Sequence, residues 1–166
     1  MASFQVDITL AVDADLNQIL DLQRLCYQSE AALYYDYSIP PLQESLTDLA
    51  NQMPSTTILK ATDGGRIIGS VRGKVLNGTC FIGRLVVHPD EQNRGIGKRL
   101  MAAIEQEFST ARRYELFTGG RSSKNLSLYQ RLGYRECRRE AVNSSLTLVY
   151  MEKISTGTSP GTSLER

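Results

Sequence analysis

The segment with the clearest chemical potential is the glycine-containing stretch Gln92-Asn93-Arg94-Gly95-Ile96-Gly97-Lys98. It follows an apolar run that ends at Val87 and precedes apolar residues at helical spacing, so we expect it to join a strand to a helix. The first N–H groups of a helix lack backbone partners and carry partial positive charge. Gly95 and Gly97 would let an anion approach these groups closely, and Arg94 and Lys98 add positive charge. The segment therefore predicts a phosphate or pyrophosphate site.

Two better-known phosphate motifs do not fit this stretch. A Walker loop needs glycine where Gln92 stands and Ser or Thr where Arg99 stands. A dinucleotide-binding fingerprint needs a third glycine at the position of Leu100. On these residues alone, the alternative is a helix start that contains two glycines and binds no ligand.

The stretch resembles the Q/R-x-x-G-x-G/A motif of the GNAT superfamily of acyl-CoA N-acyltransferases, with Gln92, Gly95 and Gly97 at the motif positions. The preceding Leu85-Val86-Val87-His88-Pro89 is similar to the family's strand ending in V-x-P. A second block, residues 125–134, resembles its N-x-x-x-Y-x-x-x-G-Y/F pattern. With the order of the elements, the resemblance covers about residues 5 to 153.

The resemblance implies an α/β fold of GNAT type, with a mixed, mostly antiparallel sheet of about seven strands and helices on both faces. It also implies acetyl-CoA as co-substrate. Its pyrophosphate would bind at the glycine stretch, and its pantetheine arm would insert beside the strand. Tyr129 would protonate the departing thiolate. The residues expected to bind acetyl-CoA are Leu85, Val86, Val87, Gln92, Asn93, Arg94, Gly95, Ile96, Gly97, Lys98 and Asn125.

The activity that the resemblance implies is acetyl transfer to a primary amine, by direct attack in a ternary complex. The amine would be a small cationic compound, a lysine or an N-terminus. The sequence departs from many members in one respect, because Cys80-Phe81-Ile82 carries no glutamate to act as base. Glu30, Asp36 and Glu115 are candidate bases, and a chain of waters is another. A non-catalytic acyl-CoA-binding or sensory module is therefore the alternative.

Charge is distributed unevenly along the chain. Residues 1–65 carry nine acidic and two basic residues, and residues 66–139 carry fifteen basic and six acidic ones. The basic part suits a ligand with several phosphates. In the acidic part, Glu30, Tyr35 and Asp36 are expected to bind a cationic acceptor through charge and cation–π attraction. Two solvated faces that balance each other are the simpler reading of the same pattern.

Composition excludes several other classes. The 166 residues fit one domain over residues 1–154, and the Ser-, Thr- and Gly-rich residues 155–166 are expected to be disordered. Three separated cysteines and a single histidine argue against disulfides and a metal centre. No signal peptide or long apolar run is present, so we expect a cytoplasmic protein without membrane contact. No nucleic-acid-reading motif accompanies the basic residues, so no nucleic-acid partner is expected. A homodimer is possible.

Hydrophobic periodicity and turn signals predict the order β-α-α-β-β-β-α-β-α-β-β. An aromatic loop at residues 34–37 joins the first two helices. The second of these is expected to begin at Pro40-Pro41 and to run to Met53. The expected strands are Phe4–Leu10, Thr57–Ala61, Arg66–Val75, Thr79–Val87, Tyr114–Thr118, Tyr134–Arg139 and Leu146–Lys153, and the later helices are Gly95–Ala111 and Asn125–Leu132.

Overall fold

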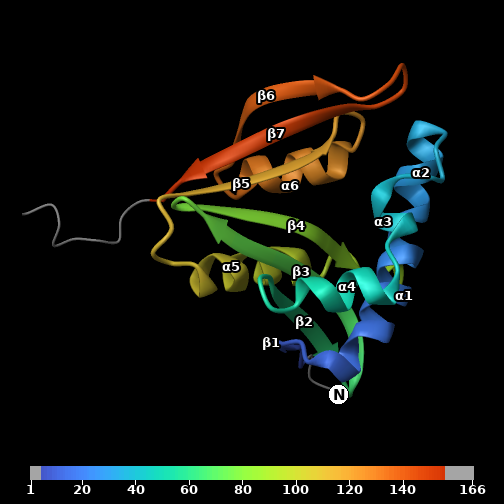
Figure 1. The fold of residues 1–166 in the computed structure, drawn as a ribbon, viewed down its shortest axis with the longest axis vertical. Coiled ribbons are helices and arrows are strands. Elements are labelled where there is room, and N and C mark those ends of the chain that lie inside the picture. Colours follow the sequence, from blue (N-terminus) through green and yellow to red (C-terminus); the bar gives the residue numbers. More distant parts are fainter. Residues whose placement is uncertain (1–4, 156–166) are drawn as a thin grey trace, which may run out of the picture.

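The computed structural model describes residues 5–155, which form seven strands and six α-helices (Figure 1). Phe4, in the first expected strand, and residues 156–166, in the tail expected to be disordered, lie outside the described residues. The strands are β1 (Asp7–Leu10), β2 (Thr57–Asp63), β3 (Arg66–Leu76), β4 (Thr79–Val87), β5 (Arg113–Gly119), β6 (Arg135–Ala141) and β7 (Thr147–Ile154). The helices are α1 (Leu16–Cys26), α2 (Gln28–Tyr34), α3 (Pro40–Gln43), α4 (Leu46–Gln52), α5 (Ile96–Glu107) and α6 (Ser123–Arg131), and two short 3₁₀ turns cover Asp13–Asp15 and Pro89–Glu91.

The seven strands form one sheet in the order β1-β2-β3-β4-β5-β7-β6. Every pair is antiparallel except β4 and β5, so the predicted mixed, mostly antiparallel sheet is confirmed. The hairpin between β3 and β4 turns at Asn77 and Gly78, both of which have positive φ. This is the geometry that an Asn-Gly pair favours in a two-residue hairpin loop.

The pairing of β4 with β5 ends early, and this creates the opening that the site occupies. Only Thr79–Phe81 of β4 pair with Arg113–Glu115 of β5. Beyond this point β4 continues beside β3 to Val87, while β5 continues beside β7 to Gly119. The two strands therefore diverge, and the second half of β4 has a sheet partner on one side only.

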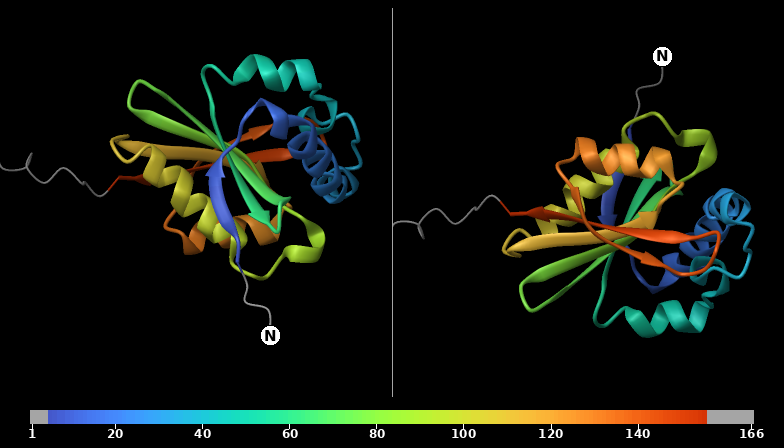
Figure 2. Two further views of the ribbon diagram at one scale, coloured as in Figure 1. Left: turned by 90° about the horizontal axis from the view of Figure 1, so that it is seen from below. Right: turned by 90° about the horizontal axis from the view of Figure 1, so that it is seen from above.

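Helices cover both faces of the sheet, as predicted (Figure 2). On one face, α1 and α4 pack against β2, β3 and β4 through a core that includes Ile19, Leu49 and Ile58. On the other face, α5 and α6 share the larger core, which contains Leu100 and Tyr129. The apolar residues of α5 recur every three or four positions, which is why one side of this helix is buried.

The helices between β1 and β2 differ from the prediction in two ways. Residues 28–34 form α2, a helix that was not predicted, so only the end of the expected loop at residues 34–37 lies between helices. The single helix expected from Pro40 to Met53 is broken into α3 and α4 at Glu44 and Ser45, which have extended backbone. Ser45 begins α4 with a capping box, because its hydroxyl accepts from the Asp48 N–H and the Asp48 carboxylate accepts from the Ser45 N–H. The apolar spacing continues across this break, so periodicity alone did not reveal it.

The break places Glu44 inside the protein. Its carboxylate accepts hydrogen bonds from Arg72 on β3 and from Gln23 on α1. Gln52 of α4 donates to the same carboxylate. This cluster of side chains fixes the helical layer on the sheet.

No helix within residues 5–155 is long and apolar enough to cross a membrane.

Candidate active site

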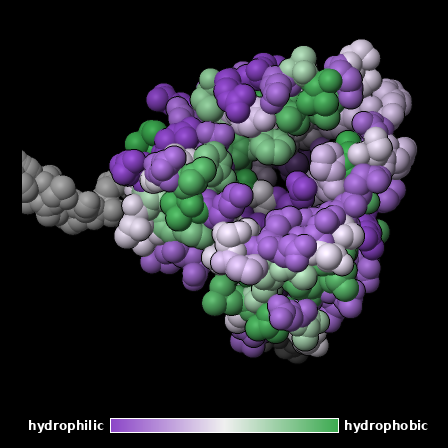
Figure 3. Space-filling model, in the orientation of Figure 1, coloured by the Kyte–Doolittle hydropathy of each residue, from purple (hydrophilic) through white to green (hydrophobic). Residues whose placement is uncertain are grey.

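A cavity of about 1010 Å³ lies where β4 and β5 diverge. Three parts of the chain line it: the α1–α2 segment, the end of β4 with the loop and helix start that follow it, and α6 with the loop before it. In the space-filling view it opens as a hollow between the helices α2 and α3 on one side and the strands β4 and β5 on the other, with hydrophilic residues at its rim (Figure 3). Among the lining residues are Leu85, Val86, Val87, Gln92, Asn93, Gly95, Ile96, Gly97, Lys98 and Asn125, all predicted to bind acetyl-CoA.

The predicted anion cradle is a turn with left-handed backbone at the beginning of α5. Gly95 caps the helix at φ 77°, and Asn93 has φ 65°. A Cβ added to Gly95 would meet nothing within 4 Å, so the space above the helix N-terminus is open. Arg94 is not among the lining residues, because its guanidinium pairs with Glu91. The cradle therefore offers backbone N–H groups and Lys98, whereas Arg94 contributes charge from outside the lining.

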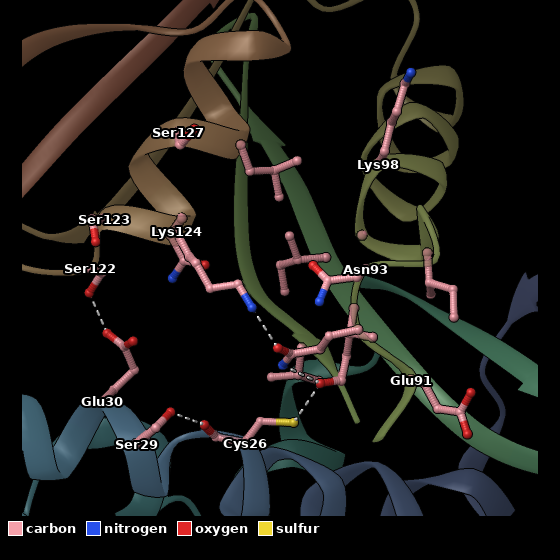
Figure 4. Close-up of a pocket in the computed structure, with 18 of the residues that line it drawn as sticks. Cys26, Ser29, Glu30, Glu91, Asn93, Lys98, Ser122, Ser123, Lys124 and Ser127 are labelled. Carbon is pink, nitrogen blue, oxygen red and sulfur yellow. Dashed lines mark hydrogen bonds between the residues drawn. The ribbon is translucent and has the colours of Figure 1, made fainter. Parts of the chain in front are cut away.

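The carbonyl of Val87 faces the cavity at the free side of β4. It accepts hydrogen bonds from Cys26 Sγ at 3.3 Å and from Gln92 Nε2 at 3.2 Å. Lys124 of α6 in turn donates to Gln92 Oε1 at 2.9 Å (Figure 4). The N–H and C=O groups of one strand residue lie on the same side of the strand, so the Val87 N–H faces the cavity too. This free strand edge can receive an extended ligand as an additional strand.

The two α6 residues of the second motif occupy different environments. Asn125 lines the cavity and donates to the Thr118 hydroxyl at 3.4 Å. Tyr129 is only 7% exposed, lies behind the cavity lining and packs against the Tyr134 ring. Burial raises the pKa of Tyr129, and the neighbouring charges of Tyr27 and Glu30 raise it further. Tyr129 is therefore a neutral phenol whose hydroxyl makes no hydrogen bond to any residue in the range 5–155.

The residues predicted on the acceptor side are not brought together. Glu30 lines the cavity, but Tyr35 and Asp36 do not. Tyr35 is 80% exposed, and the Asp36 carboxylate accepts from the backbone and hydroxyl of Ser38. Asp36 and Tyr35 follow the end of α2, a helix that was not predicted, and this places them beyond the cavity wall. Glu115, another candidate base, forms an ion pair with Arg113 on β5 and is not part of the lining.

Sequence reasoning missed several residues of the cavity wall. Cys26 was not predicted to be part of the site, yet its thiol donates to the Val87 carbonyl, and burial raises the pKa of the thiol to about 11. Tyr27, at the junction of α1 and α2, also lines the cavity, and burial raises its pKa. Ser122, the residue before α6, and Lys124, in its first turn, project toward the same space (Figure 4). No local motif marks these residues, because the fold brings them together from distant segments.

The groups that line the cavity match the chemical groups of coenzyme A. An open helix N-terminus with Lys98 fits a pyrophosphate, and a strand edge without a sheet partner fits an amide-containing arm. Residues 5–155 contain no group of three or more His, Cys, Asp or Glu side chains that could hold a metal ion.

Comparison with known proteins gives the same family. A family model described as "Acetyltransferase (GNAT) domain" matches residues 27–155. The fold is similar to that of PaiA N-acetyltransferase from Thermoplasma acidophilum in complex with coenzyme A, with TM-score 0.75, 20% identity and coverage of 90% of this chain and 99% of that one. It is also similar to the ribosomal-protein-S18-alanine N-acetyltransferase from Escherichia coli, with TM-score 0.76, 16% identity and coverage of 94% and 97%.

A curated relative, the UPF0157 protein YqkA of Bacillus subtilis, is 28% identical over 131 residues. The match covers 79% of this chain and 38% of the relative, so the chain spans well under half of that protein's length. The family match covers most of the chain and includes both motifs and the diverging strands. The protein described here belongs to the GNAT acetyltransferase domain family.

Proposed function

We propose that the protein is an acetyl-CoA-dependent N-acetyltransferase that acts on a primary amine. The observation that carries the proposal is the divergence of β4 from β5 after Phe81, which leaves the end of β4 without a sheet partner beside an open glycine-containing helix N-terminus. This arrangement combines a free strand edge with an anion cradle in one cavity. The family membership and the coenzyme A in the complex of the Thermoplasma acidophilum N-acetyltransferase support the same ligand.

The residues that line the cavity would bind acetyl-CoA, and Tyr129, behind the lining, would act on a proton. The backbone of Leu85–Val87 and Asn125 would hold the pantetheine arm, while Asn93, Gly95, Gly97 and Lys98 would hold the pyrophosphate. When bound, acetyl-CoA supplies a thioester that is electrophilic toward an amine. The Val87 N–H, which faces the cavity, would stabilise negative charge on the acyl oxygen. Tyr129 would hold the proton that the departing sulfur needs.

The acceptor is proposed to approach from the α1–α2 side of the cavity. The carboxylate of Glu30 lies on this wall, and Tyr27 lies beside it. An ammonium group is attracted by both a carboxylate and an aromatic face. The acceptor site is therefore proposed on Glu30 and Tyr27, and no longer on Tyr35 and Asp36.

The proposed cofactor site is tested by calorimetric titration of acetyl-CoA into the wild-type protein and two variants of Gly95. Asn and Asp both tolerate left-handed backbone, so Gly95→Asn and Gly95→Asp differ mainly in charge. We expect Gly95→Asp to weaken binding at least about tenfold more than Gly95→Asn, because its carboxylate would repel the pyrophosphate. Equal affinities of the two variants would contradict binding at the cradle.

The acyl-CoA-binding module remains a second candidate because the stretch Cys80-Phe81-Ile82 of β4 carries no carboxylate that could act as a base. A module without catalysis would bind acetyl-CoA but release no free thiol in the presence of amines.

A further inference from the structure

The cavity wall contains two carboxylates among the residues that the structure describes, Glu30 and Glu91. Both carboxylate oxygens of Glu91 are paired with arginines. Arg66 donates to one oxygen at 2.8 Å, and Arg94 pairs with the other. Glu91 also belongs to the 3₁₀ turn that precedes the cradle. Glu30 has no cationic partner within residues 5–155, and it lies on the α1–α2 wall, on the far side of the cavity from the cradle (Figure 4). It is therefore the carboxylate available to an acceptor amine.

A chain of hydrogen bonds holds Glu30 in place. The Arg121 N–H donates to the Tyr34 hydroxyl at 2.8 Å, and the Tyr34 and Ser122 hydroxyls are 2.9 Å apart. The Ser122 hydroxyl donates to Glu30 Oε1. Because Ser122 has only one hydroxyl proton, Tyr34 must be the donor to Ser122. The donors therefore run in one direction, from a backbone N–H of the β5–α6 loop to the Glu30 carboxylate.

The two hydroxyl groups in this series of hydrogen bonds, those of Tyr34 and Ser122, belong to buried side chains. Tyr34 is 3% exposed and Ser122 is 4% exposed, so neither is free to turn toward solvent. Gly119, at the end of β5, makes room for the Tyr34 hydroxyl, because a Cβ on this residue would clash with the hydroxyl oxygen. This end of β5 is therefore built to receive the Tyr34 hydroxyl that aligns Ser122 and Glu30.

The arrangement fixes one oxygen of Glu30 and leaves the other accessible. Oε1 accepts from Ser122, whereas Oε2 makes no hydrogen bond to any residue within 5–155. We propose that Glu30 is the general base of the reaction, accepting the acceptor's proton at Oε2 directly or through one water, and that Ser122 and Tyr34 are its positioning residues. This proposal rests on the proposed acetyl transfer and identifies the residue that activates the amine.

The proton balance is simple. An alkyl ammonium loses one proton to Glu30 and becomes a neutral amine. The amine nitrogen then forms the C–N bond as the C–S bond breaks, and the sulfur takes the proton of Tyr129. The second proton of the nitrogen replaces the one that Tyr129 has given up, so the phenol is restored. The overall reaction releases one proton, which Glu30 passes to solvent. An alkyl amine has a pKa near 10, so only about one molecule in a thousand is neutral at pH 7 without a base.

The neighbouring titratable groups do not obscure a test between pH 7 and 9. Burial raises the pKa of Tyr27, of Tyr129 and of Cys26, so all three stay protonated there. Lys124 donates to Gln92 on the cradle side. The Arg121 guanidinium approaches the Leu33 carbonyl at 3.5 Å, on α2.

The test compares thiol release from acetyl-CoA with two acceptors, 1,4-diaminobutane and methoxyamine. The diamine is almost entirely ammonium at pH 7, whereas methoxyamine is already neutral. We expect Glu30→Gln to lower kcat/KM for the diamine about 100-fold at pH 7, the lower range for loss of a general base. The defect should shrink about tenfold per pH unit as the diamine itself deprotonates. Activity with methoxyamine should change less than about threefold.

The matched control is Glu136→Gln on β6, which makes the same chemical change on an exposed carboxylate paired with Arg139. It should leave activity with both acceptors unchanged. Ser122→Ala and Tyr34→Phe should each give a smaller, similarly pH-dependent loss with the diamine alone. A merely structural defect would lower activity with both acceptors equally at every pH, and that result would overturn the positioning roles.

A spectroscopic measurement tests the proposal without turnover. In protein labelled with ¹³C at the glutamate carboxyl carbons, the signal that disappears in Glu30→Gln belongs to Glu30. The chemical shift of this signal should change when 1,4-diaminobutane is added to the acetyl-CoA complex. In Ser122→Ala its chemical shift should differ from that in the wild type even before the diamine is added. A Glu30 signal that does not respond to the diamine would overturn the proposal, even where thiol release is observed.

The outcomes separate this proposal from the proposed function. If wild-type protein binds no acetyl-CoA by calorimetry, the proposed function fails and the base assignment fails with it. If wild-type protein and Glu30→Gln release thiol with the diamine equally at pH 7, the acetyltransferase stands and Glu30 is not its base. If wild-type protein binds acetyl-CoA but releases thiol with neither acceptor, the binding module is favoured and the base is overturned.

Discussion

Nη2 of Arg72 lies 2.6 Å from Oε1 of Glu44, and both side chains are more than nine-tenths buried. The pair connects β3 to the short break between α3 and α4. Arg84 of β4 adds a second positive charge, with its Nε 4.0 Å from the same carboxylate oxygen. A buried charge that loses its partner is strongly destabilising, so this cluster should control how firmly the helices hold to the sheet.

Replacing Glu44 with glutamine should lower the free energy of unfolding by about 3–5 kcal/mol, because Arg72 and Arg84 would remain without a carboxylate. Denaturation by urea, followed by circular dichroism, measures this loss. Glu136→Gln changes a carboxylate on the exposed strand β6 and should shift the urea midpoint little. Equal midpoints for Glu44→Gln and the wild type would show that the cluster contributes no net stability.

The Glu44 carboxylate should also make the free energy of unfolding depend on pH in the acidic range. Burial alone would raise the pKa of Glu44, but hydrogen bonds from Arg72 and Gln23, with the charges of Arg72 and Arg84, outweigh it and lower the pKa from 4.5 to about 2. A pKa depressed on folding contributes stability above the unfolded-state value, and this contribution is lost as pH falls toward the folded-state value. The difference in unfolding free energy between wild type and Glu44→Gln should therefore be constant above about pH 5 and shrink between pH 4.5 and 2. A constant difference throughout that range would contradict the assignment.

Alkylation of the cysteines can locate the bound cofactor. Cys137 is exposed and should react with iodoacetamide first, whereas Cys80 is fully buried, with a pKa that burial raises to about 12, and should not react in the folded protein. Cys26 lies at the cavity and should react slowly, faster as pH rises toward its pKa of about 11. Acetyl-CoA at ten times its Kd should slow Cys26 about tenfold without affecting Cys137. Mass spectrometry of peptides measures each rate, and unprotected Cys26 would contradict cofactor binding beside Val87.

The substitution Tyr129→Phe distinguishes two roles of Tyr129, proton donation by its hydroxyl and packing by its ring. We expect kcat to fall about 100-fold, because the departing sulfur would lose its proton source, while the affinity for acetyl-CoA stays the same. The ring contact with Tyr134 is kept in this variant, so thermal unfolding should shift little. Steady-state kinetics with calorimetry distinguishes the two roles. An unchanged kcat would assign Tyr129 to the core alone.

Local signals in the sequence predicted most of the sheet. The strand Thr79–Val87 was predicted with the bounds that the structure has, and Asn77-Gly78 before it takes the hairpin geometry that such a pair favours. The glycine stretch also predicted the start of α5, because positive φ at Gly95 is a local requirement that glycine meets. These features depend on neighbouring residues, which explains why a single sequence revealed them.

The parts that could not be predicted depend on contacts between distant segments. The break between α3 and α4 exists because Glu44 turns inward to Arg72, 28 residues away in the sequence. Glu30 was named as a candidate, but its separation from Asp36 depends on α2, and its partner Ser122 lies 92 residues away. Hydrophobic periodicity contains no information on contacts between such distant residues. The acceptor side of the cavity therefore could not be predicted from the sequence.

The central claim is acetyl transfer to an amine, and the most direct measurement is product formation. Purified protein is incubated with acetyl-CoA and a panel of primary amines, including 1,4-diaminobutane and a peptide with a free N-terminus, and free thiol and acetylated amine are quantified together. We expect thiol and acetylated product in equal amounts with at least one amine, and much less of both with Gly95→Asp than with Gly95→Asn. Tight binding of acetyl-CoA without either product across the panel would contradict the proposed activity and indicate a binding module.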